Sequence, residues 1–401
     1  MTEKVVIIGA GQAGLSAATE LRKLGHNGPI TLIGDEADHP YQRPPLSKKY
    51  LTGEITRDRL YLRPAQFFDE QSITLIRSQT VDRLDRAAQQ VFVGEQKYEY
   101  DHLILTTGAT PRYLPNDIGG ALEGVHVMRS LADTDRLAPS FLPGKRLLVV
   151  GGGYIGLEVA AVAALAGLKV TVIEMADRIL QRVAAKETSD YFRALHTSHG
   201  VEILENTGLN RLIGDTAVTG AILSNGLERS FDLVIAGIGV SPNDQIAQMA
   251  GLAVDNGIAV DSYSQTSDPH IWSAGDCASF PLGQGRVRLE SVPNAIDQAE
   301  NLAGNIMGAK QPYQPKIWFW SDQFDVKLQI AGTNAGYETV VSRPAIKPGS
   351  ASFWYYRGDV LIAVDAMNDP RSYMVGKRMI ESGNSPAKCS VSDPNTDLKS
   401  F

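Results

Sequence analysis

Two stretches of the chain share one pattern of hydrophobic and polar positions. Each begins with a continuous run of apolar, mostly β-branched residues, passes through a glycine-rich turn and continues into an alanine-rich segment: residues 4–25, "KVVIIGAGQAGLSAATELRKLG", and residues 146–168, "RLLVVGGGYIGLEVAAVAALAGL". A short continuous apolar run is typical of a strand buried on both faces, as in a parallel sheet. The pattern therefore predicts a strand, a turn and a helix, twice, in an α/β protein.

Both turns carry the spacing GxGxxG, and a second apolar strand ending in an acid follows each of them. The glycines are Gly9, Gly11 and Gly14 in the first turn, and Gly151, Gly153 and Gly156 in the second. The acids are Asp35 and Glu174, roughly 20 residues beyond the last glycine. Such glycines permit a tight turn, the approach of a pyrophosphate to the backbone and close packing of the helix. The alternative is a pair of glycine-rich turns that bind nothing.

Two dinucleotide sites in one chain imply two dinucleotides, and FAD with NAD(P)H is the economical pair. A carboxylate at Glu174 would accept hydrogen bonds from a ribose diol and repel a 2′-phosphate, which favours NADH over NADPH. Arg178 and Arg182 follow a few residues later and could reduce that preference.

Composition and charge limit the possible partners. The chain has 401 residues and a formal net charge of −7, which argues against a general nucleic-acid or anionic-membrane surface. We find no run long enough to cross a membrane, no signal-peptide pattern and no spacing typical of metal ligands. The two cysteines, Cys277 and Cys389, form no CxxC pair. These features predict a cytoplasmic protein without a metal site or a disulfide framework.

Seven motifs resemble those of one flavoprotein family. They are GAGQAG, RPPLSK, TTGATPR, GGGYIGLE, SAGDCA, ESVPNAIDQAE and FWSDQ. The chain resembles the glutathione-reductase structural class and, within it, NADH-dependent ferredoxin reductases of the putidaredoxin-reductase type. The resemblance implies two Rossmann-like dinucleotide-binding domains and a small C-terminal α/β domain. We expect a discontinuous FAD domain at 1–112 and 242–314, an NADH domain at 113–241 and a C-terminal domain at 315–401, with a mobile tail from about residue 382.

The resemblance also implies how non-covalent FAD would be held by the first fingerprint. Ala13 and Asp35 would contact the diphosphate and the adenosine ribose, and Val81 the adenine. Arg129 would reach the phosphate side. Asp276 would bind the ribityl chain, and Val292, just before a helix expected to begin at Pro293, would lie at the pyrimidine edge of the flavin. The positive end of that helix would stabilise the negative charge of reduced flavin.

The segment "RPPLSKKYL", residues 43–51, stands where glutathione-reductase relatives carry a cysteine pair beneath the flavin, and it contains no sulfur. The prolines fix the approach of the loop, and Ser47–Lys48 is expected to open a helical stretch. By resemblance, Lys48 points at the reactive edge of the flavin and pairs with Glu158. Trp320 would lie over the flavin face and gate electron exit. The alternatives are a solvated lysine at 48 and a core tryptophan at 320.

The absence of a thiol pair constrains the mechanism. Hydride from NADH would reach flavin N5, and the electrons would leave one at a time for a 2Fe–2S ferredoxin that supplies an oxygenase. Two alternatives remain open: reduction of rubredoxin, oxygen or a quinone by the same flavin centre, or an apoptosis-inducing-factor-like flavoprotein that responds to NADH.

Overall fold

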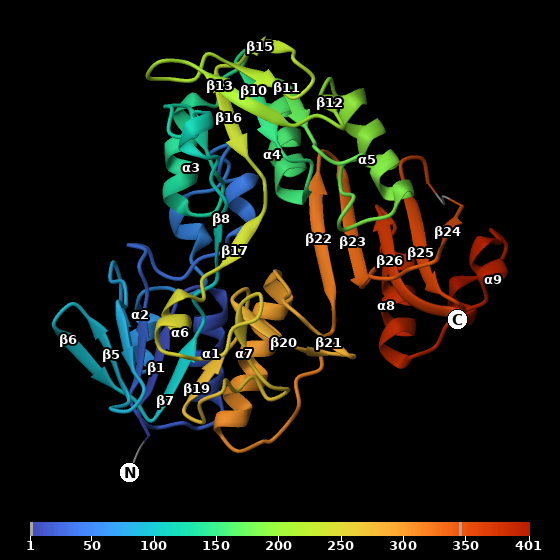
Figure 1. Cartoon of the computed structure of the whole chain (residues 1–401). Coiled ribbons are helices and arrows are strands. Elements are labelled where there is room, and N and C mark those ends of the chain that lie inside the picture. The colour runs from blue at the N-terminus through green and yellow to red at the C-terminus, as the bar shows by residue number, and fades with distance from the viewer. Residues whose placement is uncertain (1–2, 345–346) are drawn as a thin grey trace. The chain divides into compact units, whose positions relative to one another are not determined.

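A computed structural model describes residues 3–344 and 347–401 of the chain (Figure 1). The chain divides into two compact units, each assembled from three stretches. Unit 1 comprises Met1–Gln42, Arg57–Thr110 and Val240–Pro315, and unit 2 comprises Arg43–Thr56, Pro111–Gly239 and Lys316–Phe401. The chain passes from one unit to the other five times, and two of these passages lie within β8 (Ala109–Pro111) and immediately before β17 (Val240–Pro242). The three-domain boundaries expected from the sequence stay a prediction.

Unit 1 is built on a five-stranded parallel sheet. Its order is β19 (Ile271–Ser273), β7 (His102–Leu105), β1 (Val5–Ile8), β2 (Ile30–Ile33) and β3 (Ile73–Ile76). Helices α1 (Gln12–Lys23) and α7 (Val292–Ile306) pack together on one face, where Val5 and Ile7 join their core. Val6 and Ile8 point into a second core on the other face, because successive side chains of a strand alternate.

Shorter elements complete unit 1. They are the antiparallel sheet β4 (Arg83–Asp85), β5 (Gln90–Val93) and β6 (Gln96–Glu99); the sheet β18 (Ile258–Ala259), β20 (Ala278–Leu282) and β21 (Gly285–Val287); and the helices η2 (Arg57–Leu60), α2 (Gln66–Glu70) and α6 (Gln245–Met249).

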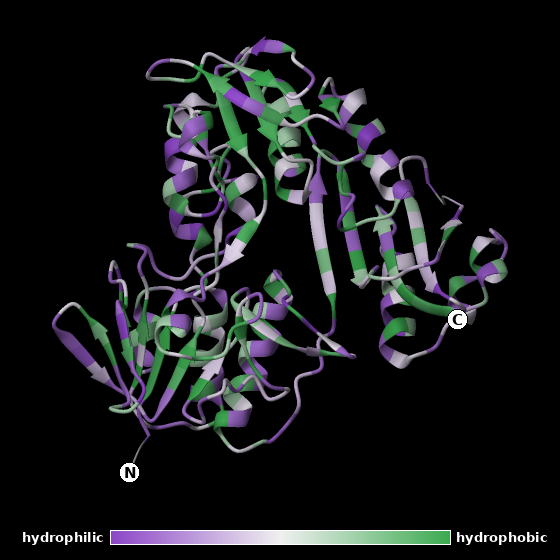
Figure 2. Cartoon of the chain, viewed as in Figure 1, coloured by the Kyte–Doolittle hydropathy of each residue, from purple (hydrophilic) through white to green (hydrophobic). Residues whose placement is uncertain are grey.

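Unit 2 contains a second five-stranded parallel sheet. Its order is β12 (Glu202–Leu204), β11 (Lys169–Ile173), β10 (Arg146–Val150), β16 (Leu233–Ala236) and β9 (Val125–His126). Figure 2 shows hydrophobic residues concentrated along its central strands, as expected for strands covered on both faces. The accompanying elements are α3 (Leu131–Leu137), α4 (Tyr154–Leu165), α5 (Lys186–Ser198) and the antiparallel β13 (Leu209–Ile213), β14 (Gly220–Leu223) and β15 (Glu228–Ser230).

An antiparallel sheet forms the C-terminal part of unit 2. Its order is β22 (Trp318–Gln323), β23 (Val326–Gly332), β26 (Val360–Met367), β25 (Ala351–Arg357) and β24 (Thr339–Arg343). Helix α8 (Pro370–Ser382) follows, with the Asp369 side chain accepting a hydrogen bond at its N-terminus. The last residues form α9 (Lys388–Ser392) and η5 (Leu398–Ser400), and Val391 and Leu398 are buried. This packing differs from the mobile tail expected from the sequence.

The fold class is confirmed: two Rossmann-like units of strand, glycine turn and helix, and a smaller α/β part at the C-terminus. Within residues 3–344 and 347–401, no helix combines the length and the apolar character needed to cross a membrane.

Candidate functional site

The two glycine-rich turns have the same geometry. Gly9 and Gly151 adopt φ values of +111° and +109°, which side chains disfavour. A Cβ on Gly14 would lie 2.0 Å from the Gly9 carbonyl oxygen, and one on Gly156 would lie 2.2 Å from that of Gly151. These four glycines are therefore required by the turn itself and by the close approach of helix to strand.

The middle glycines have a different cause. Gly11 and Gly153 stand at the N-termini of α1 and α4 with φ values of −97° and −82°, which any residue can adopt. A Cβ at either position would meet no protein atom within 4 Å. The fold thus places no demand for glycine there, whereas a pyrophosphate lying against the helix N-terminus does. Both turns fit a dinucleotide.

The acid after the second strand is placed differently in the two units. Glu174 follows Ile173, and its carboxylate accepts from the backbone N–H groups of Gly152 and Ala176, both at 2.8 Å. The matching position in unit 1 is Gly34, where a Cβ would lie 2.6 Å from that of Ala10. Asp35 therefore comes one residue later and is exposed. The Glu174 carboxylate is fixed at the turn, whereas Asp35 lies at its edge.

Three distant segments of unit 1 meet at the start of α1. Gly275, with φ +83°, lies so close that a Cβ there would be 3.0 Å from that of Ala13 and 3.8 Å from that of Ala295. Asp276 follows Gly275, and Val292 is the first residue of α7, one turn before Ala295. The structure thus brings the predicted flavin-binding residues Ala13, Asp276 and Val292 to one region. Helix α7 begins at Val292, one residue earlier than expected, with the Ser291 side chain as its cap.

Two other predicted flavin-binding residues lie elsewhere. Val81 is half-buried between β3 and β4, against the core that contains Ile33. Arg129 belongs to unit 2, where it precedes the capping box of Ser130 and Asp133, and its carbonyl oxygen accepts from Arg43 Nη1 at 2.8 Å. The assigned roles of all these residues stay predictions.

The segment that carries Lys48 is a short 3₁₀ helix, η1 (Pro44–Ser47). Lys48 ends this helix, with φ −131° and ψ −118°, so the expectation that Ser47–Lys48 opens a helical stretch is wrong. The physical reason is the pair of prolines: a fixed φ favours the first residues of a helix, and the turn begins there. The Lys48 side chain extends from the end of this helix toward α4.

The expected ion pair between Lys48 and Glu158 is confirmed. Lys48 Nζ lies 3.0 Å from Glu158 Oε1, and both side chains are largely withdrawn from solvent, with exposed fractions of 17% and 8%. A buried carboxylate needs further donors. Ser47 Oγ donates to Oε2 at 3.0 Å and Ser321 Oγ to Oε1 at 2.8 Å. Sequence reasoning missed Ser321, which lies 163 residues from Glu158 in the chain, so no local spacing indicated the contact.

Trp320 and Asp322 lie on β22 beside this pair. Asp322 Oδ2 is 3.8 Å from Lys48 Nζ, a longer contact than that of Glu158. The Trp320 ring stacks on Trp318, with centroids 5.6 Å apart and planes at 29°, and Trp318 packs into the core beside α8. Trp320 is half-buried, which is compatible with both interpretations of this residue, a core tryptophan and a residue of the flavin site.

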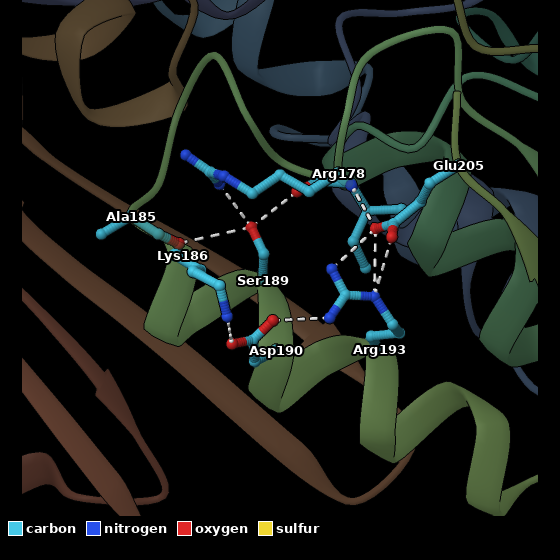
Figure 3. Close-up of polar contacts among 8 residues, drawn as sticks. Arg178, Ala185, Lys186, Ser189, Asp190, Arg193 and Glu205 are labelled. Carbon is cyan, nitrogen blue, oxygen red and sulfur yellow. Dashed lines mark hydrogen bonds and ion pairs between the residues drawn. The ribbon is translucent and has the colours of Figure 1, made fainter. Parts of the chain in front are cut away.

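Figure 3 shows the surroundings of α5, which follows the Glu174 loop. Arg178 donates to Ser189 Oγ, while Arg193 binds Glu205 and Asp190, and Lys186 binds Asp190 (Figure 3). Glu205 Oε1 also accepts from the Ile179 backbone at 2.8 Å. Arg178, one of two arginines expected to reduce the preference for NADH, is thus tied to α5, whereas Arg182 is exposed.

Comparisons with known proteins agree with this geometry. Residues 3–299 match the family described as pyridine nucleotide-disulphide oxidoreductase, and residues 318–401 match a family described as reductase C-terminal. The chain is 44% identical to rhodocoxin reductase of Rhodococcus erythropolis, over 98% of this chain and 93% of that protein. It is 41% identical to a ferredoxin–NAD(P)⁺ reductase of Sphingomonas sp, over 99% and 97%.

A solved structure shows the same likeness in three dimensions. A chain of the covalent putidaredoxin reductase–putidaredoxin complex superposes on this chain with a TM-score of 0.95 and 39% sequence identity. The match covers 99% of this chain and 97% of the other.

Proposed function

The chain belongs to the pyridine nucleotide-disulphide oxidoreductase family, and we propose that within this family it is a FAD-dependent reductase that takes hydride from NADH and delivers single electrons to a 2Fe–2S ferredoxin. The reductases that it resembles over nearly their whole length support this assignment. The ferredoxin in turn would supply an oxygenase.

The cysteine content of the chain is the observation that favours an external one-electron acceptor. A disulfide reductase passes both electrons to a cysteine pair, whereas the two cysteines of this chain are free: Cys277 is buried in unit 1 and Cys389 is exposed in unit 2. Lys48, which lies in the segment where the resemblance places the thiols of disulfide reductases, forms an ion pair with Glu158 of α4. The chain therefore offers no cysteine pair as a thiol relay, which supports an electron acceptor outside the chain.

The flavin, when bound, supplies the hydride acceptor and releases electrons one at a time. Gly11 leaves room for its pyrophosphate, and Gly153 leaves room for that of NADH. The Glu174 carboxylate would accept a hydrogen bond from the adenosine ribose of NADH. The Lys48 ammonium, held by Glu158, would supply a positive charge to the reactive edge of the flavin and would favour its reduction. We also assign Trp320 to the electron exit.

Anaerobic titration of the purified protein with NADH tests the proposal. A bound flavin band that bleaches with about one equivalent of NADH, followed by reduction of added 2Fe–2S ferredoxin, is the expected result. A colourless protein, or a yellow one indifferent to NADH, would overturn it. Faster turnover with rubredoxin, oxygen or a quinone would reassign the acceptor. A dimer that appears only after reduction by NADH would point instead to a signalling flavoprotein.

We propose the cytoplasm as the compartment, because NADH, the proposed donor, is produced there.

A further inference from the structure

Strand β22 turns two polar side chains toward the interior of unit 2. Ser321 and Gln323 are fully buried, whereas Trp320 and Asp322, which alternate with them, are accessible. Buried hydroxyl and amide groups are costly unless every polar atom finds a partner. Their partners connect Glu158 to a histidine far along the chain.

The connection is a chain of three hydrogen bonds. Ser321 Oγ donates to Glu158 Oε1 at 2.8 Å, and Gln323 Nε2 donates to Ser321 Oγ at 3.1 Å. Gln323 Oε1 lies 2.8 Å from Nε2 of His196, on helix α5. His196 is fully buried as well, so all three links lie out of contact with solvent.

With Glu158 as the carboxylate partner of Lys48, only one arrangement of hydrogen atoms satisfies all three links. A serine hydroxyl has a single hydrogen, and donating it to Glu158 leaves Ser321 Oγ to accept from the Gln323 amide. The Gln323 carbonyl must then face His196, whose Nε2 must carry a hydrogen. If the amide were reversed, its carbonyl would face Ser321, and the serine would turn its hydrogen away from Glu158. The orientation of Gln323 thus decides whether Glu158 keeps a donor.

The surroundings of His196 suit a neutral imidazole with its hydrogen on Nε2. Nδ1 is buried, and no described residue hydrogen-bonds to it, which is less costly for a bare lone pair than for an N–H. The ring packs edge-on against Phe324, with centroids 5.0 Å apart. Burial lowers the pKa of His196 to about 4, although the hydrogen bond with Gln323 acts in the opposite direction; His199 lowers the pKa to a smaller extent. The ring therefore stays uncharged at neutral pH.

We propose that His196 is a positioning residue for Lys48, acting through Gln323, Ser321 and Glu158. His196 locks the Gln323 amide, the amide aims the Ser321 hydroxyl, and the hydroxyl holds the Glu158 carboxylate that pairs with Lys48. The role in catalysis rests on the proposed function, in which Lys48 serves the flavin; the hydrogen-bond order does not. Glu158 and Asp322 are the charged groups that face Lys48.

The first test reads the imidazole directly and needs no turnover. With ¹⁵N-labelled histidine in the holoprotein, His196 should show a protonated Nε2 and a bare Nδ1, unchanged between pH 5.5 and pH 8. His196→Gln identifies its signals. A hydrogen on Nδ1, or titration of the ring within that range, would overturn the proposed order of donors.

The second test measures the rate constant of flavin reduction at saturating NADH. His196→Phe keeps an aromatic ring at this position but removes the donor, and we expect the rate constant to decrease roughly threefold to tenfold. His196→Gln places an amide donor near the position of Nε2 and should restore most of the rate. His199→Phe is the matched control, because His199 stacks on Phe324 with centroids 3.9 Å apart but forms no link to Gln323. Equal rates for His196→Phe and wild type would overturn the proposal.

A double-mutant cycle separates positioning from a general loss of packing. Ser321→Ala cuts the chain between His196 and Glu158, so His196→Phe should slow the reaction no further in that background. Additive losses would show that His196 acts independently of Glu158 and would overturn the proposal. If wild type itself fails to react with NADH, the proposed function fails, while the nitrogen signals of His196 still decide the hydrogen-bond order.

Discussion

At the scale of single residues, the glycines of each fingerprint meet two different requirements, one from the fold and one from a bound ligand. Gly14 and Gly156 are required by the fold, because a methyl group would collide with the carbonyl of the preceding turn. Gly11 and Gly153 face open space, so only a ligand excludes a side chain there. Substituting the two kinds of glycine should therefore affect folding and ligand binding separately.

Gly153→Ala should weaken NADH binding by at least about tenfold while leaving thermal unfolding nearly unchanged, because the methyl group would occupy the place of the pyrophosphate. Gly156→Ala, the matched control, should cost roughly 1–3 kcal/mol of stability through its contact with the Gly151 carbonyl. Calorimetry and NADH titration measure both. Undiminished NADH affinity in Gly153→Ala would contradict the placement of NADH at this turn.

Glu174→Gln should narrow the preference for NADH over NADPH by roughly tenfold, because the amide neither repels a 2′-phosphate nor accepts as strongly from the ribose. The ratio of kcat/KM for the two nucleotides is the measurement. Glu202→Gln is a suitable control, since Glu202 is a carboxylate on the neighbouring strand that pairs with Arg229. An unchanged ratio in Glu174→Gln would place the ribose contact elsewhere.

Lys48→Ala should slow flavin reduction by roughly tenfold or more while FAD stays bound, because the positive charge is lost and the Glu158 charge is left without its cation. Stopped-flow reduction by NADH gives the rate, and the flavin to protein absorbance ratio gives the content. The exposed neighbour Lys49→Ala should behave as wild type. Full-speed reduction in Lys48→Ala would remove this residue from the mechanism.

Sequence reasoning located the residues whose position depends on local spacing and missed those whose hydrogen-bond partners are remote in the sequence. The glycines and Glu174 could be predicted because the turn and its acid lie within about 20 residues of one another. The pairing of Lys48 with Glu158 came from resemblance to a family. Ser321, Gln323 and His196 could not be found, since their hydrogen bonds join residues more than 100 apart, apart from the neighbouring link on β22.

At the scale of elements, helices were predicted well and irregular segments were not. Helices α1 and α4 start at the glycine turns as expected, and α7 begins within one residue of the prediction. The segment at 43–51 was misjudged because two prolines favour a helical start at Pro44, rather than a few residues later. The polar composition of the tail concealed Val391 and Leu398, which are buried against β24–β26 and α8.

At the same scale, Arg343 anchors the C-terminal segment by hydrogen bonds to its backbone. Its guanidinium is buried, and it donates to the carbonyls of Val391 at 3.0 Å, Asp393 at 3.3 Å and Thr396 at 2.7 Å. A charged group that satisfies three carbonyls fixes a segment that has few apolar residues of its own.

Arg343→Met should therefore increase the rate of proteolysis within residues 384–401 by at least about tenfold, because each hydrogen bond from a charged donor contributes roughly 1.5–3 kcal/mol. Limited proteolysis followed by mass spectrometry measures the effect. Arg371→Met is the control, since Arg371 pairs with Asp397 of the same tail but in an exposed ion pair, which contributes little. Equal cleavage in both variants would show that the apolar contacts alone hold the tail.

At the scale of the whole molecule, unit 2 gathers the proposed catalytic residues from three stretches of the chain. Lys48 comes from 43–56, Glu158 from 111–239 and Trp320 from 316–401. The fold class could be predicted from the repeated strand–turn–helix pattern. The inclusion of 43–56 in unit 2 could not, because a short segment within 1–112 shows no change in composition where it leaves one core for another.

Unit 2 also contains two buried titratable groups with opposite effects on stability. Asp365 accepts from the hydroxyls of Thr188 and Tyr355 and, within the part of the chain that the structure describes, has no ion-pair partner. Burial raises the pKa of Asp365 to about 6. Its contribution to stability is present below the unfolded pKa, near 3.8, and is lost as the pH rises through 6.

His196 acts in the other direction, since burial lowers its pKa to about 4. Its contribution is present above the unfolded pKa, near 6.5, and is lost as the pH falls through 4. Between pH 4 and pH 6 the two groups oppose each other, each by about 3 kcal/mol across its range. The contribution of this pair to the free energy of unfolding of the wild-type protein should therefore depend only weakly on pH, because two steep dependences of opposite sign cancel.

Single substitutions should expose each dependence. Asp365→Asn leaves His196 unopposed, so the free energy of unfolding should fall more steeply than in wild type as the pH decreases from 6.5 to 4.5. His196→Gln leaves Asp365 unopposed and should fall less steeply, or rise, over the same range. Urea unfolding of the three proteins at matched flavin content gives the slopes. Parallel curves for all three would mean that neither group changes its protonation with folding, and the same slope change in both variants would contradict the assigned signs.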